Sequence, residues 1–474
     1  METGQEPVFG TVKAPISPIE AGNAQKHPRC DAGGLRYTRA ANLFAEPSMQ
    51  KGMDYDVVVV GGGPAGSSAA TTLRRRGRRV LLLEKERFPR FHIGESQLPG
   101  LNGILEQLGA EECISAERFV QKWGATFTSS DARFDQYADF ALAAETPRPQ
   151  TVQVPRDRFD RALLEHSRRC GAEVIEGARA EDVEFGPVAV TVSFVTTDGE
   201  RRSAVVAAVV DASGRSGFLA KRFGRREVDP VLRNVAVHAQ FEGVPRREGR
   251  RAGDIQMVTR PDKGWFWFIP ISDTVMSVGA VIPKTVHDAR PRLDAAAALA
   301  AYIAETPAAA KLMENGRRVS EGRFDADYSY IGSELAGDRW ALVGDAAAFL
   351  DPIFSTGVLM AMQSGIEVGL AIDAGLQRGD LSHRCFAEFQ QTLRRRYGHF
   401  RRFACGFYDP AFRDLFFSRT RRWGIYEAVL SVMAGNWKPS LVTRVRLRAF
   451  FLLVAVQRRF AIAPRVHSES WTRS

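Results

Sequence analysis

Three glycines near residue 60 have a spacing that suits the binding of a pyrophosphate. Gly61, Gly63 and Gly66 in the run GGGPAGSS form a GxGxxG pattern, and Ala65 lies inside the same turn. The first glycine permits a tight turn, the second lets the backbone approach a pyrophosphate, and the third lets a helix pack closely on a strand. Glu84 follows eighteen residues after Gly66, where a carboxylate accepts hydrogen bonds from an adenosine ribose.

These residues need a strand before them and a helix after them. The run YDVVVV (55–60) predicts a buried strand, and PAGSSAATTLRRRG (64–77) predicts a helix closed by Gly77. The run RRVLLLEKE (78–86) predicts a second strand. Together they form one βαβ unit whose helix offers free N–H groups to phosphates. A glycine-rich turn without a ligand is the alternative, which the combined pattern disfavours.

A second, distant segment decides between NAD and FAD. Gly344 and Asp345, in RWALVGDAAAFLDP, follow a predicted strand and precede a predicted helix. Such a late Gly-Asp pair is typical of flavoproteins, in which the aspartate binds the ribityl chain. The run VVDASG, which ends at Gly214, is the other strand usual in that group. We therefore expect FAD, and no second GxGxxG predicts a separate NAD(P)H domain.

The run GWFWFIPI (264–271) is aromatic on both faces if it forms a strand. Side chains alternate along a strand, so Trp265 and Trp267 share one face while Phe266 and Phe268 share the other. Aromatic residues are enriched in strands, so this run is either an ordinary core strand or a wall between two sites.

Composition sets the broad class of the chain. Its 474 residues are 45% hydrophobic and 25% charged, which is usual for a globular protein. No apolar stretch approaches the roughly 20 residues that span a bilayer. The five cysteines are scattered without a CxxC pair, which argues against a metal site and a disulfide framework and predicts a reducing, cytoplasmic location. The net charge of +10 suits anionic lipid, phosphorylated cofactors or an acidic protein.

The order of patterns along the chain predicts an α/β fold. We expect a Rossmann-type FAD-binding domain, an antiparallel β-rich substrate domain and a helical C-terminal region. The predicted limits are a flexible extension at 1–52, the FAD-binding domain at 53–225 and 335–385, the substrate domain at 226–334 and the basic helical region at 386–474.

With these segments the sequence resembles the FAD-dependent aromatic hydroxylase superfamily. Within it, WxWxIP is the signature of flavin-dependent halogenases, and here it is formed by Trp265, Trp267, Ile269 and Pro270. The resemblance covers roughly residues 53 to 400 and is strongest to the phenol and pyrrole branch. The runs FPRFHIGES (88–96), QKWGATF (121–127) and DPIFSTG (351–357) occur in the order expected of that family.

The resemblance implies a reaction and assigns its residues. Reduced FAD, O2 and chloride or bromide would yield hypohalous acid, which passes through a tunnel to Lys122 and then to a phenol or pyrrole. The substrate would be free or tethered to an acyl carrier, and a separate flavin reductase would supply FADH2. Thr356 and Gly357 would hold the halide, with Val358 beside the flavin, and the tryptophan strand would separate flavin from substrate.

The resemblance also places a loop and an arginine at the cofactor. Arg90, Ile93 and Gly94 correspond to a loop that passes along the flavin, and Arg156 corresponds to an arginine near it; solvated surface arginines are the alternative. Two positions depart from relatives. Phe354 replaces the glutamate of tryptophan halogenases, so tryptophan is not expected as substrate. Leu359 replaces a histidine frequent in the phenol and pyrrole branch, which leaves open a relative without halide chemistry.

The C-terminal region alternates arginine clusters with apolar runs, as in TLRRRYGHFRRF. Helices that pack over the substrate pocket with solvated arginine faces are the favoured interpretation; peripheral membrane contact or an acidic carrier protein is the alternative, and no nucleic-acid module is recognised. Two other functions stay open: an FAD-dependent monooxygenase or dehydrogenase of the same superfamily, and a non-catalytic flavin-binding protein that docks to a membrane or partner.

Overall fold

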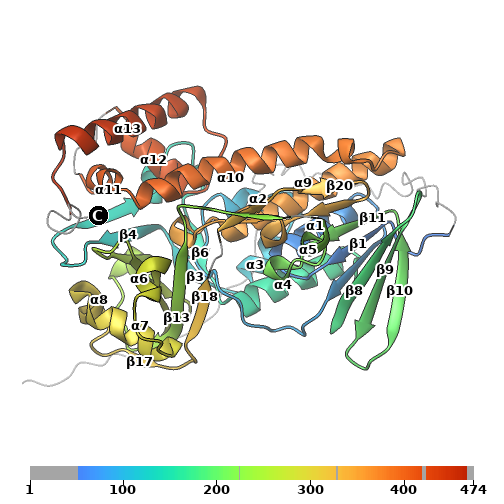
Figure 1. Cartoon of the computed structure of the whole chain (residues 1–474), viewed down its shortest axis with the longest axis horizontal. Helices are drawn as coiled ribbons and strands as arrows, with labels where there is room; N and C mark the ends of the chain where they lie inside the picture. Colours follow the sequence, from blue (N-terminus) through green and yellow to red (C-terminus); the bar gives the residue numbers. More distant parts are fainter. Residues whose placement is uncertain (1–51, 224, 327–328, 419–422, 467–474) are drawn as a thin grey trace, which may run out of the picture. The chain divides into compact units, whose positions relative to one another are not determined.

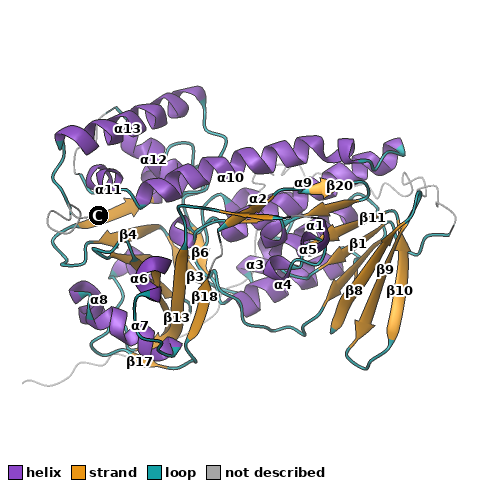
Figure 2. Ribbon diagram, viewed as in Figure 1, coloured by secondary structure: helices purple, strands orange, loops and turns teal. Residues whose placement is uncertain are grey.

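The structure, a computed structural model, describes residues 52–223, 225–326, 329–418 and 423–466. Except for Gly52, the predicted flexible extension at 1–52 lies outside the described residues. Figure 1 colours the chain by sequence and Figure 2 by secondary structure. The predicted α/β class is confirmed: a mainly parallel sheet, several antiparallel sheets and a helical C-terminal region are all present.

A six-stranded sheet carries the nucleotide turn. Its central strands are runs of Val and Leu that are buried throughout, the composition that a parallel sheet covered on both faces requires. β1 pairs in parallel with β2 and with β11, and Val57 lies beside Val80 and Ala208. The strands, in their order across the sheet, are β20 (Ala336–Gly337), β21 (Trp340–Leu342), β11 (Ala208–Asp211), β1 (Val57–Val60), β2 (Val80–Glu84) and β7 (Glu173–Glu176).

Helix α1 (Pro64–Arg75) contacts both α4 (Arg156–Arg169) and α9 (Gly357–Arg378). The contact with α9 is unusually close, since a Cβ on Gly365 would lie 2.2 Å from the carbonyl oxygen of Ala65. Contrary to the expectation from the sequence, α9 is long and apolar enough to span a membrane by length and composition, but 61% of its apolar window is buried inside the fold, as in the core helix of a globular domain.

An eight-stranded sheet forms the β-rich part. It includes β4 and β5, which belong to the segment predicted for the FAD-binding domain, so the sheet extends beyond residues 226–334; the predicted domain limits themselves stay a prediction. Its main path is β17 (Arg317–Arg318), β13 (Asn234–Glu242), β16 (Val275–Pro283), β15 (Trp265–Pro270), β14 (Ile255–Thr259), β4 (Gly124–Thr128) and β5 (Asp135–Asp139), with β18 (Arg323–Ala326) paired to β13.

Strand β15 explains why GWFWFIPI is aromatic on both sides. Trp265, Trp267 and Ile269 face the largest apolar core, whereas Phe266 and Phe268 face a second core. That second core is closed by helices α7 (Ala295–Ala304) and α8 (Pro307–Leu312). A strand buried in two cores needs bulky side chains on both faces, so packing alone accounts for the phenylalanines.

Smaller elements connect these layers. The minor sheets are β10 (Arg201–Val206), β9 (Val190–Thr196) and β8 (Ala178–Phe185); β12 (Arg226–Val228), β19 (Tyr330–Gly332) and β22 (Ala348–Phe349); and the pair β3 (Val120–Lys122) and β6 (Thr151–Gln153). The remaining short helices are α2 (Leu101–Leu108), α3 (Glu111–Ser115), α5 (Ala220–Phe223), α6 (Lys284–Asp288), η1 (Phe140–Leu142), η2 (Gly214–Ser216), η3 (Gly249–Gly253), η4 (Gly344–Ala346), η5 (Pro352–Phe354) and η6 (His383–Phe386).

The C-terminal region is helical, as predicted. It consists of α10 (Ala387–Phe407), α11 (Pro410–Phe416), α12 (Ile425–Met433) and α13 (Leu441–Phe460). Their apolar sides join the same core as the tryptophans of β15, through Phe407, Phe412 and Leu447 among others. These helices therefore help to enclose the interior that Trp265 faces.

Candidate functional site

The glycine turn between β1 and α1 has the geometry that its sequence predicts. Gly61 has φ +108°, and a Cβ there would lie 2.3 Å from the carbonyl oxygen of Ala212. A Cβ on Gly66 would lie 1.9 Å from the carbonyl oxygen of Gly61. Gly63 is different, because its nearest neighbour would be 3.3 Å away on the Arg90 side chain. The protein itself constrains Gly63 little, as expected if this glycine serves a ligand.

The N-terminus of α1 is open to an anion. No side chain caps it, and its first turn, which includes Ala65, holds no acidic residue. Its first N–H groups thus lack the partners that side chains usually provide. Glu84 lies beside the turn, 4% exposed, and accepts hydrogen bonds from the backbone N–H groups of Gly62 at 2.6 Å and Glu86 at 2.9 Å. This arrangement fits the pyrophosphate and ribose of FAD.

The loop at residues 88–97 is anchored to α4 by Arg156, the arginine that the family resemblance assigns to the surroundings of the cofactor. Arg156 forms two hydrogen bonds with Asp160, at 2.7 and 2.9 Å, and donates to the carbonyl oxygen of Ile93 at 2.6 Å. Gly94 has φ +107°, and a Cβ there would lie 2.9 Å from Arg156. Arg90 also reaches Asp160, at 3.2 Å. Both arginines are partly or fully buried and paired rather than solvated.

Asp160 is a partner that sequence reasoning missed. It lies four residues after Arg156 on α4, a spacing that brings side chains together on one helix face. The i,i+4 pair in RDRFD was the available signal. Its carboxylate is fully buried and compensates two guanidinium groups that would otherwise be costly to bury.

The late Gly-Asp segment lies against the start of α1. Gly344 has φ +58°, and a Cβ there would lie 2.8 Å from the Cβ of Ala65. The next residue, Asp345, lies in η4. Burial raises the pKa of Asp345 to about 6, although Arg156 and Arg215 oppose the shift. Two motifs separated by most of the chain are thus in close contact, the property expected of a shared cofactor site.

The segment before α9 leaves a buried hydroxyl without a partner. Thr356 is 1% exposed, and its Oγ1 has no hydrogen-bond partner among the described residues. It stands at the N-cap of α9 without capping the helix, and Val358 is buried in the first turn. A Cβ on Gly357 would meet nothing nearer than Phe349, at 3.9 Å. An unsatisfied donor, an uncapped helix end and free space beside a glycine fit an anion, as the predicted halide role requires.

Lys122 ends β3 in the interior of the protein. Its side chain is 1% exposed, and Nζ donates to Ser96 Oγ and to the carbonyl oxygen of Gln97, both at 2.8 Å. The ring of Phe140 lies 5.2 Å from Nζ. Burial lowers the pKa of Lys122 to about 7, and Asp254 opposes the shift. Near neutral pH the side chain therefore populates both the ammonium and the amine.

The two tryptophans of β15 are held by specific hydrogen bonds. Trp265 Nε1 donates to Tyr408 Oη at 2.8 Å, and Trp267 Nε1 donates to Ser277 Oγ at 3.2 Å. The Trp267 ring lies across Gly279, where a Cβ would be 2.2 Å from it. Ile269 and Pro270 continue the strand and pair with β16. The indoles are thus fixed in place rather than free to swing.

A buried polar network joins this strand to the segment at 351–357. Asp351 Oδ2 accepts hydrogen bonds from Tyr408 at 2.9 Å and from Asn234 Nδ2 at 2.8 Å, and Oδ1 accepts from the Ile353 N–H at 3.1 Å. Burial raises the pKa of Asp351 to about 6. Sequence reasoning missed Asn234 and Tyr408, and only the acidic residue before Pro352 hinted at this network.

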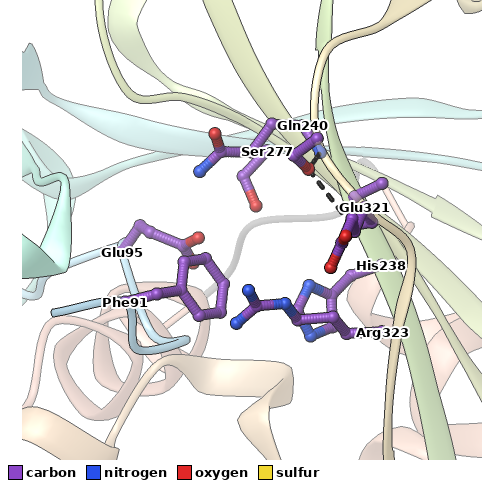
Figure 3. A pocket seen from close by; sticks show the side chains of 9 residues that line it. Phe91, Glu95, His238, Gln240, Ser277, Glu321 and Arg323 are labelled. Atoms are coloured by element: carbon purple, nitrogen blue, oxygen red, sulfur yellow. Dashed lines mark hydrogen bonds between the residues drawn. The ribbon is translucent and has the colours of Figure 1, made fainter.

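A small cavity lies between the loop that carries Phe91 and Glu95 and the strand residues His238, Gln240 and Ser277 (Figure 3). Its volume is about 50 Å³, which suits water or a small ion rather than an aromatic molecule. Glu95 and His238 are both 3% exposed and line it. The His238 ring lies 5.9 Å from that of Trp267, and burial raises the pKa of Glu95. Neither residue was predicted, although Glu95 lies in the run FPRFHIGES.

The two positions that depart from relatives are packed in the apolar core. Phe354 is 6% exposed and contacts Phe407 edge to face, with ring centroids 5.8 Å apart. Leu359 is 5% exposed. The acid that opposes the pKa shift of Lys122 is Asp254, which already accepts from the N–H groups of Trp123 and Gly124. No carboxylate from this segment joins Lys122.

Comparison with known proteins places these motifs in context. Residues 54–384 match the family described as an FAD binding domain. A 1H-pyrrole-2-carbonyl-[peptidyl-carrier protein] chlorinase from Pseudomonas fluorescens is 34% identical over 371 residues, which cover 72% of this chain and 80% of that protein. A flavin-dependent halogenase from Armillaria mellea is 32% identical over 327 residues, covering 63% of this chain but only 61% of its own length.

Two solved structures extend the comparison. The myxobacterial chondrochloren halogenase has a TM-score of 0.70 and 35% identity, covering 86% of this chain and 91% of that chain. A flavoprotein/dehydrogenase from Cytophaga hutchinsonii has a TM-score of 0.78 and 28% identity, covering 85% of this chain and 98% of that chain.

Proposed function

This chain belongs to the flavin-dependent halogenases of the FAD-binding family, and we propose that it halogenates an electron-rich aromatic through Lys122. The observation that carries the proposal is the state of that lysine, which is buried, bonded to two oxygen acceptors and shifted to a pKa of about 7. In most proteins a lysine side chain keeps its ammonium group in water. Burial of this one needs a reason, and halogen transfer supplies it.

Both protonation states of Lys122 suit the chemistry. When bound, reduced FAD with O2 and a halide supplies the hypohalous acid. The Lys122 amine takes the halogen from hypohalous acid and releases water, and the aromatic carbon then takes the halogen and returns a proton. Alternatively, the ammonium donates a hydrogen bond to the oxygen of hypohalous acid and makes the halogen more electrophilic. Ser96 and Gln97 fix the position of Nζ in either case.

Thr356 and Gly357 are the residues that we assign to the halide. The unpartnered Thr356 hydroxyl and the N–H groups that begin α9 provide donors for an anion. Such donors are needed because a halide removed from water without partners is strongly destabilised.

The tryptophan strand is assigned to the separation of the two reactions. Trp265 and Trp267 are anchored by their N–H groups, and their face belongs to the same apolar core as Val358 and Phe140. Phe140 is the ring beneath Lys122. The indoles therefore stand in an interior that extends from the start of α9 to the lysine, where bulky fixed rings keep an aromatic substrate from the flavin.

The substrate class follows from what surrounds the site. With Phe354 and Leu359 in the apolar core, neither position supplies a base that could activate a poor nucleophile. A phenol or pyrrole, free or tethered to a carrier protein, is electron-rich enough without such help, and a related chlorinase acts on a carrier-bound pyrrole. We also propose that a separate flavin reductase supplies reduced FAD, as the resemblance to flavin-dependent halogenases implies.

Product mass tests the proposal. The full-length protein is given chemically reduced FAD, O2, chloride or bromide, and a phenol or pyrrole. The expected product carries the halogen that was supplied and disappears when halide is omitted. A hydroxylated product that is independent of halide would instead show a monooxygenase.

A dehydrogenase is the second candidate, because one similar structure is described as a flavoprotein/dehydrogenase. In that case an organic substrate would reduce bound FAD without O2, and bleaching of the flavin absorbance in an anaerobic mixture would reveal it.

A further inference from the structure

Helix α13 presents an exposed face that the described part of the chain leaves uncovered. It lies beyond residue 384, where the match to the FAD binding domain family ends. One stripe of the helix is buried, formed by Thr443, Leu447, Phe450, Val454 and Gln457 at alternating intervals of three and four residues. The opposite stripe has the same spacing and is formed by Val445, Arg448, Leu452, Ala455 and Arg459.

This outer stripe is both apolar and basic. Val445 is 55% exposed and Leu452 is 66% exposed, and Phe460 at the end of the helix is 69% exposed. Side chains of this size are usually covered when they follow a regular helical spacing. Val445 and Leu452 lie two helical turns apart on the same exposed stripe, which indicates a face that binds a partner.

The arginines of this face, Arg448 and Arg459, and the exposed Arg444 that borders it lack carboxylate partners within the described part of the chain. The sequence of α13 contains five arginines and no acidic residue. Arg458 pairs with Asp409, but Arg444, Arg448 and Arg459 form no ion pair among the described residues. Two further carboxylates contact α13, but through its buried stripe: Glu145 accepts from Thr443, and Asp414 accepts from Gln457.

A neighbouring helix adds to the positive charge. Arg402, on α10, lies 3.7 Å above the ring of Phe451, a residue of α13. Burial and the adjacent Arg448 both lower the pKa of Arg402. Two guanidinium groups that repel each other at a surface are stabilised when an anion approaches.

We propose that the exposed face of α13 is the docking surface for a small acidic carrier protein that brings the aromatic substrate on its arm. The inference rests on the proposed function, because only a tethered substrate needs such a partner. Acidic side chains of a partner helix would pair with Arg444, Arg448 and Arg459, while its apolar residues would contact Val445 and Leu452.

The pattern favours an acidic protein over a membrane. A helix that lies in a membrane surface keeps its apolar residues together on one face and its basic residues on the other. Here the basic and apolar residues share one stripe: Arg448 lies between Val445 and Leu452, and Arg459 follows Leu452 farther along the helix. Mixed contacts of this kind, with arginine among apolar residues, are typical of protein interfaces.

The test measures binding of a peptidyl carrier protein that bears a pyrrole-2-carbonyl group. Full-length protein is compared with the charge-reversal variant Arg444→Glu/Arg448→Glu and with Leu452→Ser. The matched control is Arg292→Glu/Lys311→Glu, which makes the same change in charge at exposed positions before α7 and on α8, helices that lie away from α13 (Figure 1). Circular dichroism with thermal melting verifies that each variant folds.

The proposal predicts saturable binding by the wild type that weakens as salt is raised. Charge reversal on α13 should weaken it by at least about tenfold, Leu452→Ser should weaken it less, and the control should bind as the wild type does. Absence of binding, or equal binding by the α13 variant and the wild type, contradicts the proposal. So does arginine-dependent binding to phosphatidylglycerol vesicles without binding to the carrier protein.

A second readout separates this inference from the proposed function. Binding needs no turnover, so it is also measured with Lys122→Met, which should bind the carrier protein normally. In halogenation assays the α13 reversal should raise KM for the tethered pyrrole and leave the turnover of a free phenol or pyrrole unchanged. If the wild type bound the carrier protein but halogenated neither the tethered nor the free substrates, the catalytic proposal alone would be disproved.

Discussion

Lys122 Nζ donates to Ser96 Oγ at 2.8 Å, and the same nitrogen donates to the carbonyl oxygen of Gln97, the residue that follows. The loop that holds the lysine is the continuation of the loop that Arg156 anchors through Ile93. The carbonyl group bonded to Arg156 and the two groups bonded to Lys122 therefore lie on one short segment, residues 93–97. This link makes the position of the lysine dependent on the same segment that is predicted to pass along the flavin.

Ser96→Ala should shift the pH dependence of halogenation. The serine oxygen accepts a hydrogen bond from the ammonium, so its loss disfavours the charged form and lowers the pKa of Lys122 below its present value of about 7. The midpoint of the rate against pH should move to lower pH. An unchanged midpoint would show that another group controls the profile.

Stability should depend on pH through the same lysine. The pKa of Lys122 is about 7 in the folded protein against 10.5 for an exposed lysine, so the unfolded chain binds the proton more tightly. The folded state therefore gains stability as pH rises from about 7 toward 10.5, by up to about 1.4 kcal/mol per pH unit. Urea unfolding at pH 7 and pH 9 should show this gain in the wild type and a smaller one in Lys122→Met. Equal gains in both proteins would mean that the lysine is not desolvated.

Thr356→Val should raise stability and weaken halide use at the same time. The substitution removes a buried hydroxyl without a partner, which relieves a penalty of about 1–3 kcal/mol, while it deletes a donor for the anion. KM for chloride should rise and the urea midpoint should increase. Ser431→Ala is the matched control, since Ser431 is also buried with an unpartnered hydroxyl among the described residues, but on α12; it should leave KM for chloride unchanged. A Thr356→Val enzyme with normal KM for chloride would remove Thr356 from the halide site.

Gly61→Ala should abolish FAD binding. A Cβ would lie 2.3 Å from the Ala212 carbonyl oxygen, so the turn must move, at a cost above about 3 kcal/mol. Gly77→Ala provides the comparison, because Gly77 has φ +80° but a Cβ there would meet no atom within 4 Å; it should cost about 1–2 kcal/mol and retain FAD. Flavin absorbance per mole of purified protein measures both. FAD at wild-type level in Gly61→Ala would disprove the predicted role of the turn.

Tyr408→Phe should loosen the tryptophan strand. The variant leaves the Trp265 N–H without its acceptor and removes one of the donors to Asp351, which should reduce the free energy of unfolding by about 1–3 kcal/mol. Urea unfolding checks the loss, and the yield of halogenated product per FADH2 oxidised should fall if the indoles separate the two reactions. Unchanged stability would show that the network is not needed to hold Trp265.

The elements that depend on neighbouring residues were predictable from the sequence. The glycine turn, the helix that Gly77 ends and the alternation in β15 all follow from local backbone and packing rules. Lys122 was identified only by resemblance, because its burial depends on β6 and on residues 96–97, which the local pattern does not place beside it.

Contacts between distant segments were not predictable. Trp265 and Tyr408 are 143 residues apart, and Asn234 and Asp351 are 117 apart. A single sequence has no local signal for such pairs, since each residue is an ordinary strand, helix or loop residue in its own surroundings. For the same reason the pairing of β4 with β14, across more than a hundred residues, could not be foreseen: the alternation along a strand does not reveal which sheet the strand joins.

The most direct test of the central claim is the product yield of Lys122→Met with reduced FAD, O2, halide and an electron-rich aromatic. The methionine keeps the length and apolar stem of the side chain but offers no nitrogen. The account predicts that halogenated product is lost while FAD binding and FADH2 oxidation continue at the wild-type rate. Halogenation at the wild-type yield in this variant would contradict the account.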